Sequence, residues 1–340
     1  MREVARCGLR SIKVKTLVSY QQQWRQFHSW VFGGQNCYSA LTVDLVAKYL
    51  LYLFKNGSPD GRVYTGASLN LVRSSLSFFV QFSIPNLGCQ PILQRLFRYF
   101  YLERPSFPKY VVTWDVTRVL RFLATWHPAI SLDLKRLTLK TVTLLAITSC
   151  DRAQTLHLLS VEHVSISASG LEFVVPEVLK TSRKGKPARV VSCVQWPEAS
   201  LNVCDYVHAY INRTLSFRIK AVRKGLPKPV QLFLSHRTGR PVQRASISRW
   251  IREVLCLSGI NVDQYGPGST RGAASSLAST KGATAEQIMK AGSWSNVHTF
   301  IQHYQRRVED TPVGHLILQD ATVSVRGSVF YDFYFALCLY

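Results

Sequence analysis

The sequence predicts a mainly α-helical protein of two domains, with one small β-sheet in the second domain. Apolar residues recur every three or four positions through most of the 340 residues, as they do in helices that bury one face. Two prolines within four residues interrupt this pattern in the stretch Glu103–Tyr110, where we expect a linker. The clearest strand-like runs, rich in β-branched and aromatic residues, follow that linker.

The part before the linker is expected to form four helices with a basic surface. Their apolar stripes place them at Thr16–Trp30, Val43–Lys55, Ser68–Phe82 and Ile92–Tyr101. Between the second and third, the sequence Asn56–Gly61 (NGSPDG) contains the residue types that break regular structure. Arg95 and Arg98 lie on one flank of the fourth helix and contribute to the basic surface.

The part after the linker combines further helices with the predicted sheet. Leu171–Pro176 and Ala188–Val194 read as paired strands, and Leu232–Ser235 reads as a short strand followed by a turn. The expected helices are Trp114–Thr125, Leu134–Ser149, a short helix through Leu156, Leu201–Thr214, Ile247–Leu257 and three short helices within Gly268–Arg306. The chain therefore divides into a helical domain over 1–102, a linker over 103–111, a second domain over 112–310 and a C-terminal tail over 311–340.

The charge of the chain indicates a polyanionic partner. It carries 42 Lys and Arg against 19 Asp and Glu, a formal net charge of +23. Each phosphate that such residues neutralise releases counterions and adds affinity that does not depend on sequence. A basic disordered tail is excluded because 47% of residues are hydrophobic and the cations are spread along the chain. A ribosomal type of RNA binder remains an alternative from composition alone.

Two local features have alternatives of their own. We interpret the aromatic stripe of Thr16–Trp30 as a core face, and the alternative is that its rings stack on nucleic-acid bases. The apolar ending Ser328–Tyr340 is either a segment that docks on a neighbouring copy or an end without a role, and we favour the second.

The remaining composition indicates an intracellular protein with reduced cysteines, without a membrane span and without a zinc module. Eight cysteines are scattered without a C-x-x-C pair, which argues against a zinc module and a dense disulfide framework. The N-terminus is basic and lacks an apolar signal core, so secretion is not expected. No run of about 18 apolar residues is available for a membrane span.

The stretch Gly268–Arg306, GSTRGAASSLASTKGATAEQIMKAGSWSNVHTFIQHYQR, carries three chemically suitable side chains. We expect Arg271 just inside a helix start, because the preceding Ser269 and Thr270 are good capping types. Trp294 follows the small-residue break that ends a second helix, and Tyr304 lies ten residues further on. A fixed cation, an indole N–H and a phenol on three short helices can converge on one phosphate.

The order S-T-R-G-A, then A-G-S-W-S, then T-F-x-x-x-Y resembles the C-terminal half of the tyrosine recombinases, the phage-integrase family. The best match is the branch found in eukaryotic tyrosine-recombinase retroelements (DIRS- and Ngaro-like elements). Upstream, T-S-C-D-R-A-Q-T-L-H-L-L around Arg152 resembles the first arginine box of that family. The resemblance covers residues from about Trp114 to Arg307, and more loosely the helical domain before them.

The resemblance implies a role for each matching residue. Arg152 and Arg271 would grip the non-bridging oxygens of the scissile phosphate, a task suited to the planar, permanently charged guanidinium. Trp294 would hydrogen-bond the phosphate. Tyr304 would be the nucleophile, and its attack would leave a 3′-phosphotyrosyl link and a free 5′ hydroxyl. A second strand's 5′ hydroxyl would reverse the step, so that no nucleotide cofactor and no metal are needed.

The segment between the two paired strands is strongly basic, and the resemblance places a catalytic lysine there. Lys180 would donate the proton to the leaving 5′ oxygen, and we favour it over Lys184 and Lys186. The alternative is that the hairpin holds only the DNA backbone. The residues expected to contact DNA in this way are Arg183, Lys184, Lys186 and Arg189, together with Arg95 and Arg98.

Two positions depart from the family pattern. Gly268 stands where the family usually has a His, three residues before the second arginine, and losing one proton-transfer group typically costs about 10²–10⁴-fold in rate. His236, His298 and His303 are candidate substitutes. Thr155 stands where many members carry an acid, although retroelement-type members tolerate Thr there.

The sequence therefore predicts site-specific recombination of double-stranded DNA by a mobile-element type of enzyme. The family implies a clamp in which the arm (core-binding) and catalytic domains grip opposite sides of the duplex, a homo-tetramer on paired sites, and a nuclear location that follows from function. The main alternative is a catalytically degenerate DNA-binding protein, which Gly268 favours. A type IB topoisomerase-like activity and an RNA-binding role are weaker alternatives, since the arm helices and the absence of RNA-binding signatures argue against them.

Overall fold

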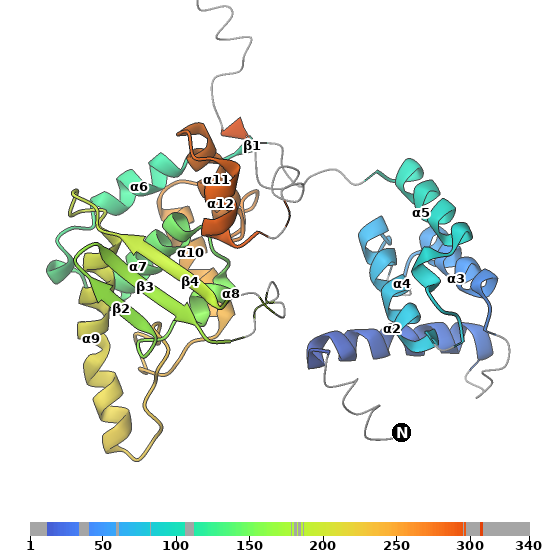
Figure 1. Cartoon of the computed structure of the whole chain (residues 1–340), viewed down its shortest axis with the longest axis horizontal. Helices are drawn as coiled ribbons and strands as arrows, with labels where there is room; N and C mark the ends of the chain where they lie inside the picture. Colours follow the sequence, from blue (N-terminus) through green and yellow to red (C-terminus); the bar gives the residue numbers. More distant parts are fainter. Residues whose placement is uncertain are drawn as a thin grey trace, which may run out of the picture. The chain divides into compact units, whose positions relative to one another are not determined.

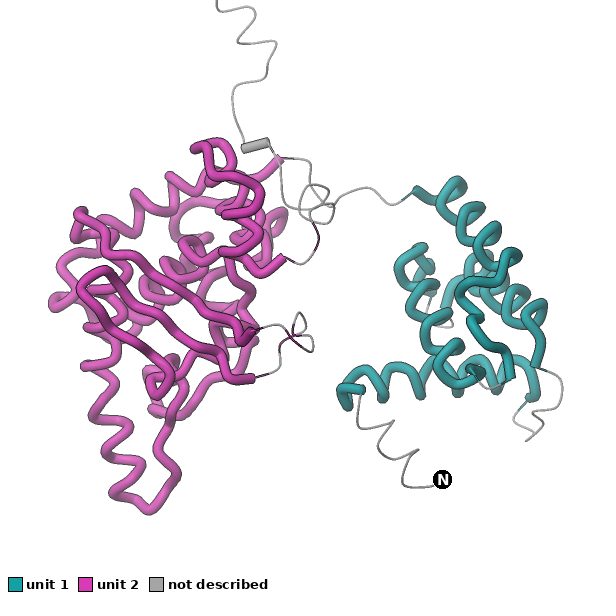
Figure 2. The backbone as a smooth tube through the Cα atoms, viewed as in Figure 1, with its two compact units in different colours: residues 1–108 teal, residues 109–340 magenta. Residues whose placement is uncertain are grey.

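The computed structural model describes residues 12–33, 41–58, 61–81, 83–105, 112–177, 179, 182, 185, 187–294 and 296, and the backbone of 307 and 308. The chain forms two compact units, Met1–Pro108 and Lys109–Tyr340 (Figure 2). Their boundary falls within the stretch 103–111 that was predicted to be a linker. The mainly helical fold class with a small β-sheet is confirmed.

The described part of the first unit is entirely helical (Figure 1). Its helices are α2 (Val14–Phe32), α3 (Val43–Asn56), α4 (Gly66–Val80) and α5 (Pro91–Glu103), with a 3₁₀ turn, η1 (Leu87–Cys89), before α5. Side-chain caps fix where α3 and α4 begin. Thr42 accepts a hydrogen bond from the backbone of Leu45, and Thr65 and Ser68 form a reciprocal capping box at α4. All four predicted helices of this part are therefore present.

The core of the first unit forms around α3. Leu50 on α3, Leu76 on α4 and Phe100 on α5 have no exposed side-chain surface. The predicted core face of α2 is buried at its centre, where Phe27 packs its ring against Tyr49 with centroids 5.1 Å apart. At the end of the stripe Trp30 is 38% exposed. The predicted core face is therefore buried in the middle of α2 and partly exposed near its C-terminus.

The second unit is built around one buried helix, α7 (Leu134–Ser149), which begins and ends at the predicted residues. Almost every side chain of α7 is buried, because it contacts helices on several sides and strand β4 on another. The surrounding helices are α6 (Val116–Ala124), α8 (Ala153–His157), α9 (Val203–Arg223), α10 (Arg244–Leu257), α11 (Ser269–Thr280) and α12 (Ala285–Gly292), with a 3₁₀ turn, η2 (Ala129–Ser131), before α7. No helix among the described residues is long and apolar enough to traverse a lipid bilayer.

An antiparallel sheet of three strands lies over α7 and α9 (Figure 1). Its strands are β2 (Val164–Ser167), β3 (Gly170–Val175) and β4 (Arg189–Val194). The register pairs Leu171 with Cys193 and Phe173 with Val191, and these four inward side chains are buried. The β3–β4 pair was predicted, whereas β2 was missed because VSIS is only four residues long, too short to show a clear strand pattern.

Three other features differ from the predictions. Helix α9 continues to Arg223 instead of ending at Thr214, because Arg218 is buried and bonds the carbonyls of Pro229 and Leu232. The predicted strand Leu232–Ser235 forms only an isolated bridge, between Leu234 and Pro241. A two-stranded parallel sheet pairs β1 (Val112–Thr113) with β5 (Arg307–Val308), a long-range pairing with no local sequence signal.

Candidate active site

The loop between α7 and α8 carries Arg152. Helix α7 ends at Cys150, which adopts a left-handed conformation with φ 51° and turns the chain sharply. The next residue, Asp151, is buried, and its backbone N–H donates to the Ser149 hydroxyl. Arg152 then occupies the position before the first residue of α8 and is exposed. The turn therefore directs one acidic side chain inwards and presents the neighbouring guanidinium to solvent.

Arg271 lies in the first turn of α11, close to the helix start that the sequence predicted, although the capping residues differ. Gly268 occupies the cap position, while Ser269 and Thr270 are the first helical residues. The Ser269 hydroxyl does not cap the helix because it accepts a hydrogen bond of 2.9 Å from the buried indole N–H of Trp114. This bond fixes the beginning of α11 against the segment that opens the second unit.

The structure brings Arg271 to the Arg152 loop. The guanidinium of Arg271 is 3% exposed, and its Nη1 donates a hydrogen bond of 3.0 Å to the carbonyl of Cys150. The two arginines that the sequence predicted to share one phosphate therefore belong to segments that touch. A cation held in such a dry site interacts more strongly with an anion than the same cation in water.

Trp294 lies directly over Arg271. The Cζ atom of Arg271 is 3.6 Å from the centroid of the Trp294 ring, a cation–π contact, and the indole is 6% exposed. Helix α12 ends at Ser293, whose left-handed conformation with φ 55° turns Trp294 back towards the helix. At Gly292 an added Cβ would lie 1.9 Å from the indole ring, so only glycine leaves room for this packing.

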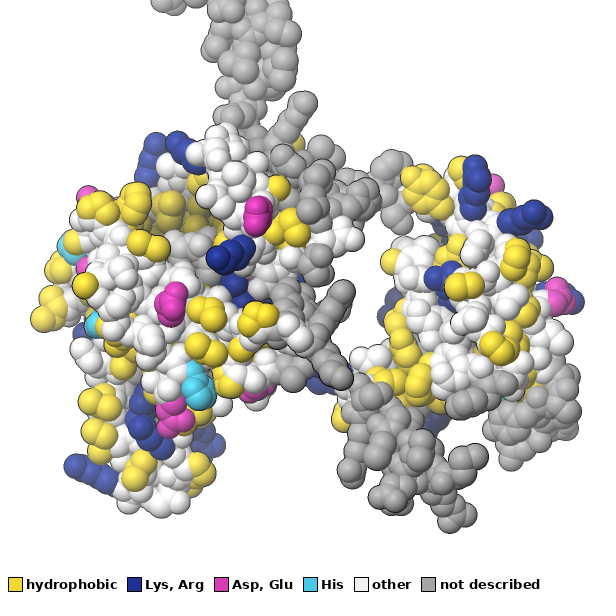
Figure 3. All heavy atoms as spheres, in the orientation of Figure 1, with side chains coloured by type: hydrophobic (Ala, Val, Ile, Leu, Met, Phe, Trp, Pro, Cys, Tyr) yellow, Lys and Arg dark blue, Asp and Glu magenta, His cyan; other side chains and the backbone are white. Residues whose placement is uncertain are grey.

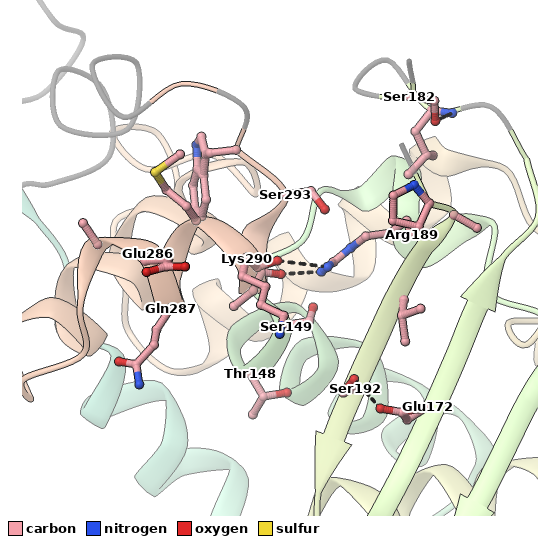
Figure 4. A pocket seen from close by; sticks show the side chains of 18 residues that line it. Thr148, Ser149, Glu172, Ser182, Arg189, Ser192, Glu286, Gln287, Lys290 and Ser293 are labelled. Carbon is pink, nitrogen blue, oxygen red and sulfur yellow. Dashed lines mark hydrogen bonds between the residues drawn. The ribbon is translucent and has the colours of Figure 1, made fainter. Parts of the chain in front are cut away.

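Arg189, predicted to contact DNA, is directed into the protein. Its Nη2 lies 2.5 Å from Oδ2 of Asp151, and the side chain is 12% exposed. Its guanidinium also donates to the carbonyls of Lys290, at 3.2 Å, and of Ala291. Figure 4 shows the side chain reaching from β4 to the end of α12. The guanidinium is thus engaged by acceptors within this unit.

Of the other predicted site residues, two belong to the first unit and five lie outside the described residues. Arg95 and Arg98 are exposed on α5 of the first unit. The predicted catalytic Lys180 and Tyr304, and the basic hairpin residues Arg183, Lys184 and Lys186, lie outside the described residues. On the face shown in Figure 3, Lys and Arg side chains are spread over each unit instead of being gathered in one patch.

Burial sets the electrostatics around Asp151. It raises the pKa of the Asp151 carboxyl, while the Arg189 and Arg271 guanidiniums act in the opposite direction. Burial also raises the pKa of the Cys150 thiol to about 11. The thiol is therefore neutral at physiological pH and unsuited to act as a nucleophile, since the thiolate is the reactive form. Among the described residues no group of three His, Cys, Asp or Glu side chains is arranged to hold a metal ion.

A pocket of about 1190 Å³ adjoins this constellation. It lies between the outward face of β3 and β4 and helix α12, and the end of α7 contributes Thr148 and Ser149 (Figure 4). Glu172 and Ser192 project into it from the sheet and are joined by a hydrogen bond of 3.0 Å. Arg189 crosses this pocket to reach α12.

No protein-family model matches the sequence, and no curated protein matches it. Solved structures do match. The XerH site-specific recombinase bound to palindromic difH substrate is 13% identical with a TM-score of 0.56, and the match covers 93% of this chain and 81% of that one. The Tn1549 transposon integrase in complex with transposon right end DNA is 12% identical with a TM-score of 0.55, covering 92% and 95%. This chain has the fold of the recombinases and integrases.

A lambda integrase dimer bound to a COC′ core site extends the likeness, at 14% identity and a TM-score of 0.52, covering 89% of this chain and 75% of that one. Sequence reasoning missed two contributors to the candidate site: Asp151 and Gly292. Asp151 could have been noticed as an acid directly before Arg152 in a chain with only 19 acidic residues. Gly292 was interpreted only as a helix break, because the close approach of Trp294 has no local signal.

Proposed function

We propose that this protein cuts and rejoins double-stranded DNA as a tyrosine-type site-specific recombinase. The observation that carries the proposal is the buried Arg271, stacked beneath Trp294 and bonded to the loop of Arg152, within a recombinase fold. Two guanidiniums whose segments are in contact suit a phosphate that becomes more negative in the transition state. The resemblance of the arginine boxes to the retroelement branch supports a mobile-element origin.

The proposed reaction is a transesterification. The Tyr304 phenolate attacks the scissile phosphorus, a P–O bond to the tyrosine forms, and the bond to the 5′ oxygen breaks. Lys180 supplies the proton that the leaving 5′ oxygen takes up. Arg152 and Arg271 neutralise the non-bridging oxygens, and Trp294 donates its indole N–H to the phosphate. Attack of a 5′ hydroxyl on the phosphotyrosine reverses these changes and restores the enzyme.

The proposed partners and assembly follow from the same reading. The first unit, over about 1–102, would act as the arm domain and the second, over about 112–310, as the catalytic domain, with both binding one duplex. The lambda integrase that resembles this chain is a dimer on its core site, which supports multimeric assembly on DNA. We propose a homo-tetramer on paired sites and a nuclear location, where the DNA substrate would be found.

Covalent trapping tests the proposal. The protein would be incubated, without added metal, with nicked duplexes taken from the DNA that flanks its gene, and resolved on a denaturing gel beside Tyr304→Phe. We expect a slower band that is absent in the variant, because only the phenol can form the phosphotyrosyl bond. The proposal is contradicted if the wild type binds these duplexes and forms no adduct, or if Tyr304→Phe forms the same adduct.

A second candidate, a DNA-binding protein that keeps the fold without the chemistry, is favoured by one observation. Gly268 is exposed at the start of α11, where the family pattern has a histidine, and an added Cβ there would meet no atom of the described residues within 4 Å. The candidate predicts salt-dependent DNA binding with no adduct in the same gel.

A further inference from the structure

Arg189 joins three segments that are distant in the sequence. From the first residue of β4 its guanidinium bonds the buried carboxylate of Asp151 and the carbonyls of Lys290 and Ala291. Asp151 is the neighbour of Arg152, and Ala291 lies three residues before Trp294. One side chain thus ties the Arg152 loop, the sheet and the end of the Trp294 helix together (Figure 4).

The chemistry of this cluster is that of an internal crosslink. The Asp151 side chain is 2% exposed, and the Nε atom of Arg189 is also buried. A buried ion pair requires good geometry and additional hydrogen bonds to offset its desolvation, and the carbonyls at the end of α12 supply them. These carbonyls also carry the negative end of the helix dipole, which favours a cation at this place.

A phosphate contact by the same guanidinium is incompatible with these bonds. Both hydrogens of Nη2 are directed to protein acceptors, since this atom bonds Asp151 and Ala291, and Nη1 bonds Lys290. An arginine that grips a phosphate presents two parallel N–H groups to it. Turning that fork towards DNA would leave the Asp151 carboxylate buried without the guanidinium that bonds it, which is strongly unfavourable.

We infer that Arg189 and Asp151 are positioning residues that hold Arg152 and Trp294 in place, and that Arg189 does not bind DNA. The catalytic consequence rests on the proposed function, whereas the crosslink itself does not. In this arrangement Asp151 positions Arg152 through the backbone between them. Arg189 positions Trp294 by holding the last turn of α12, from which the chain reverses over Arg271.

The first test separates a DNA contact from a crosslink. Each phosphate contact contributes about 0.9 to the slope of log affinity against log salt concentration. Full-length Arg189→Gln and Arg183→Gln would be compared on one random duplex over a range of salt concentrations. We expect Arg183→Gln to reduce the slope by about 0.9 and Arg189→Gln to leave it unchanged. An equal reduction in both variants would overturn the inference.

Hydrogen exchange supplies the matching structural readout. In Arg189→Gln and in Asp151→Asn, we expect faster amide exchange over 285–294 and 150–157, with the first unit unchanged as an internal control. Arg189→Lys should not rescue, because the three N–H groups of an ammonium diverge from one nitrogen and cannot reproduce the planar fork that reaches acceptors on two segments. Exchange that matches the wild type in Asp151→Asn, which conserves side-chain volume, would contradict the crosslink even if Arg189→Gln failed to fold.

Single-turnover cleavage of the trapping substrate then tests positioning. We expect Asp151→Asn to slow adduct formation about 10²-fold while DNA affinity stays unchanged, since a displacement of about 1 Å can have this effect. A merely structural role would lower the folded fraction without changing the rate per folded molecule, and that result would overturn the positioning role. If the wild type itself forms no adduct, the proposed function fails, while the exchange and salt results still decide on the crosslink.

Discussion

At the scale of single residues, the candidate site depends on backbone positions that few side chains tolerate. Cys150 and Ser293 both adopt the left-handed conformation that normally favours glycine. One directs Asp151 inwards and Arg152 outwards, and the other turns Trp294 over Arg271. Strained residues of this kind persist where the surrounding packing fixes them, and they are frequent at functional sites.

Replacement of Cys150 tests this strain. Cys150→Gly and Cys150→Ala both remove the buried thiol, but only glycine relieves the left-handed backbone at φ 51°. We expect the glycine variant to be more stable than the alanine variant by about 1 kcal/mol. Urea unfolding of the two variants measures the difference. Equal midpoints would show that the turn carries no strain.

Restoration of the missing histidine tests the chemistry of the site. No atom of the part of the chain that the structure describes lies within 4 Å of a Cβ added at Gly268, and its φ is −68°, so Gly268→His is expected to fold normally. If proton transfer limits the rate, the variant should form the phosphotyrosyl adduct about 10²-fold faster than the wild type. The measurement is single-turnover trapping, with Gly268→Ala as a control for the change in backbone. An acceleration shared by the alanine variant would show that helix geometry is responsible.

At the scale of elements, the site is made where the ends of α7, α11 and α12 meet. Helix α7 is buried on nearly all sides and therefore fixes the Arg152 loop at its C-terminus. Trp114 fixes the start of α11 through Ser269, and Arg189 fixes the end of α12. Arg152, Arg271 and Trp294 each lie within a turn of such an anchored helix end, which is how short helices can hold precise geometry.

The packing of α12 against Trp294 predicts a strong effect of one methyl group. In Gly292→Ala the new Cβ would lie 1.9 Å from the indole ring, so the ring must leave its place over Arg271. We expect a loss of about 1–3 kcal/mol in stability, as for other overpacked sites, and a slower adduct. Thermal unfolding and trapping measure both, with Gly66→Ala as a glycine control that has no positive φ and at which an added Cβ meets no atom of the described residues within 4 Å. A Gly292→Ala variant as stable and active as the wild type would contradict the observed packing.

At the scale of the whole molecule, the charge of +23 is suited to DNA, but not all of the basic side chains face solvent. Lys140 has no exposed surface. Its Nζ donates to the carbonyl of Trp126 at 2.7 Å and lies 3.9 Å from the Tyr206 ring. Burial lowers the pKa of Lys140 to about 7. The stability of the protein should therefore depend on pH well above neutrality.

The sign of this dependence follows from proton binding. Between pH 7 and about pH 10 the unfolded chain keeps the Lys140 proton, whereas the folded protein has lost it. Stability should therefore rise with pH in this window, by up to about 3 kcal/mol, and the rise should be absent in Lys140→Met. Urea unfolding of both proteins at pH 7 and pH 9.5 gives the comparison. Parallel pH profiles would contradict the assignment.

The sequence by itself determined the helices, the β3–β4 pair and the order of the site residues along the chain. Apolar periodicity and capping residues act within a few positions, so α7 could be predicted to the residue. The chemistry expected of Arg152 and Arg271 came from motif order, and the structure places their segments in contact.

Only the tertiary structure decided which polar groups the interior uses. Arg189 has the sequence context of a DNA-binding residue, yet it is held by two distant segments. Asp151 lies 38 residues before it, and the end of α12 lies 101 and 102 residues after it. Trp114 owes its importance to a single contact with Ser269, 155 residues away. Such pairings leave no local trace, because a side chain's partner is set by where the packed elements bring the chain together and not by its neighbours in sequence.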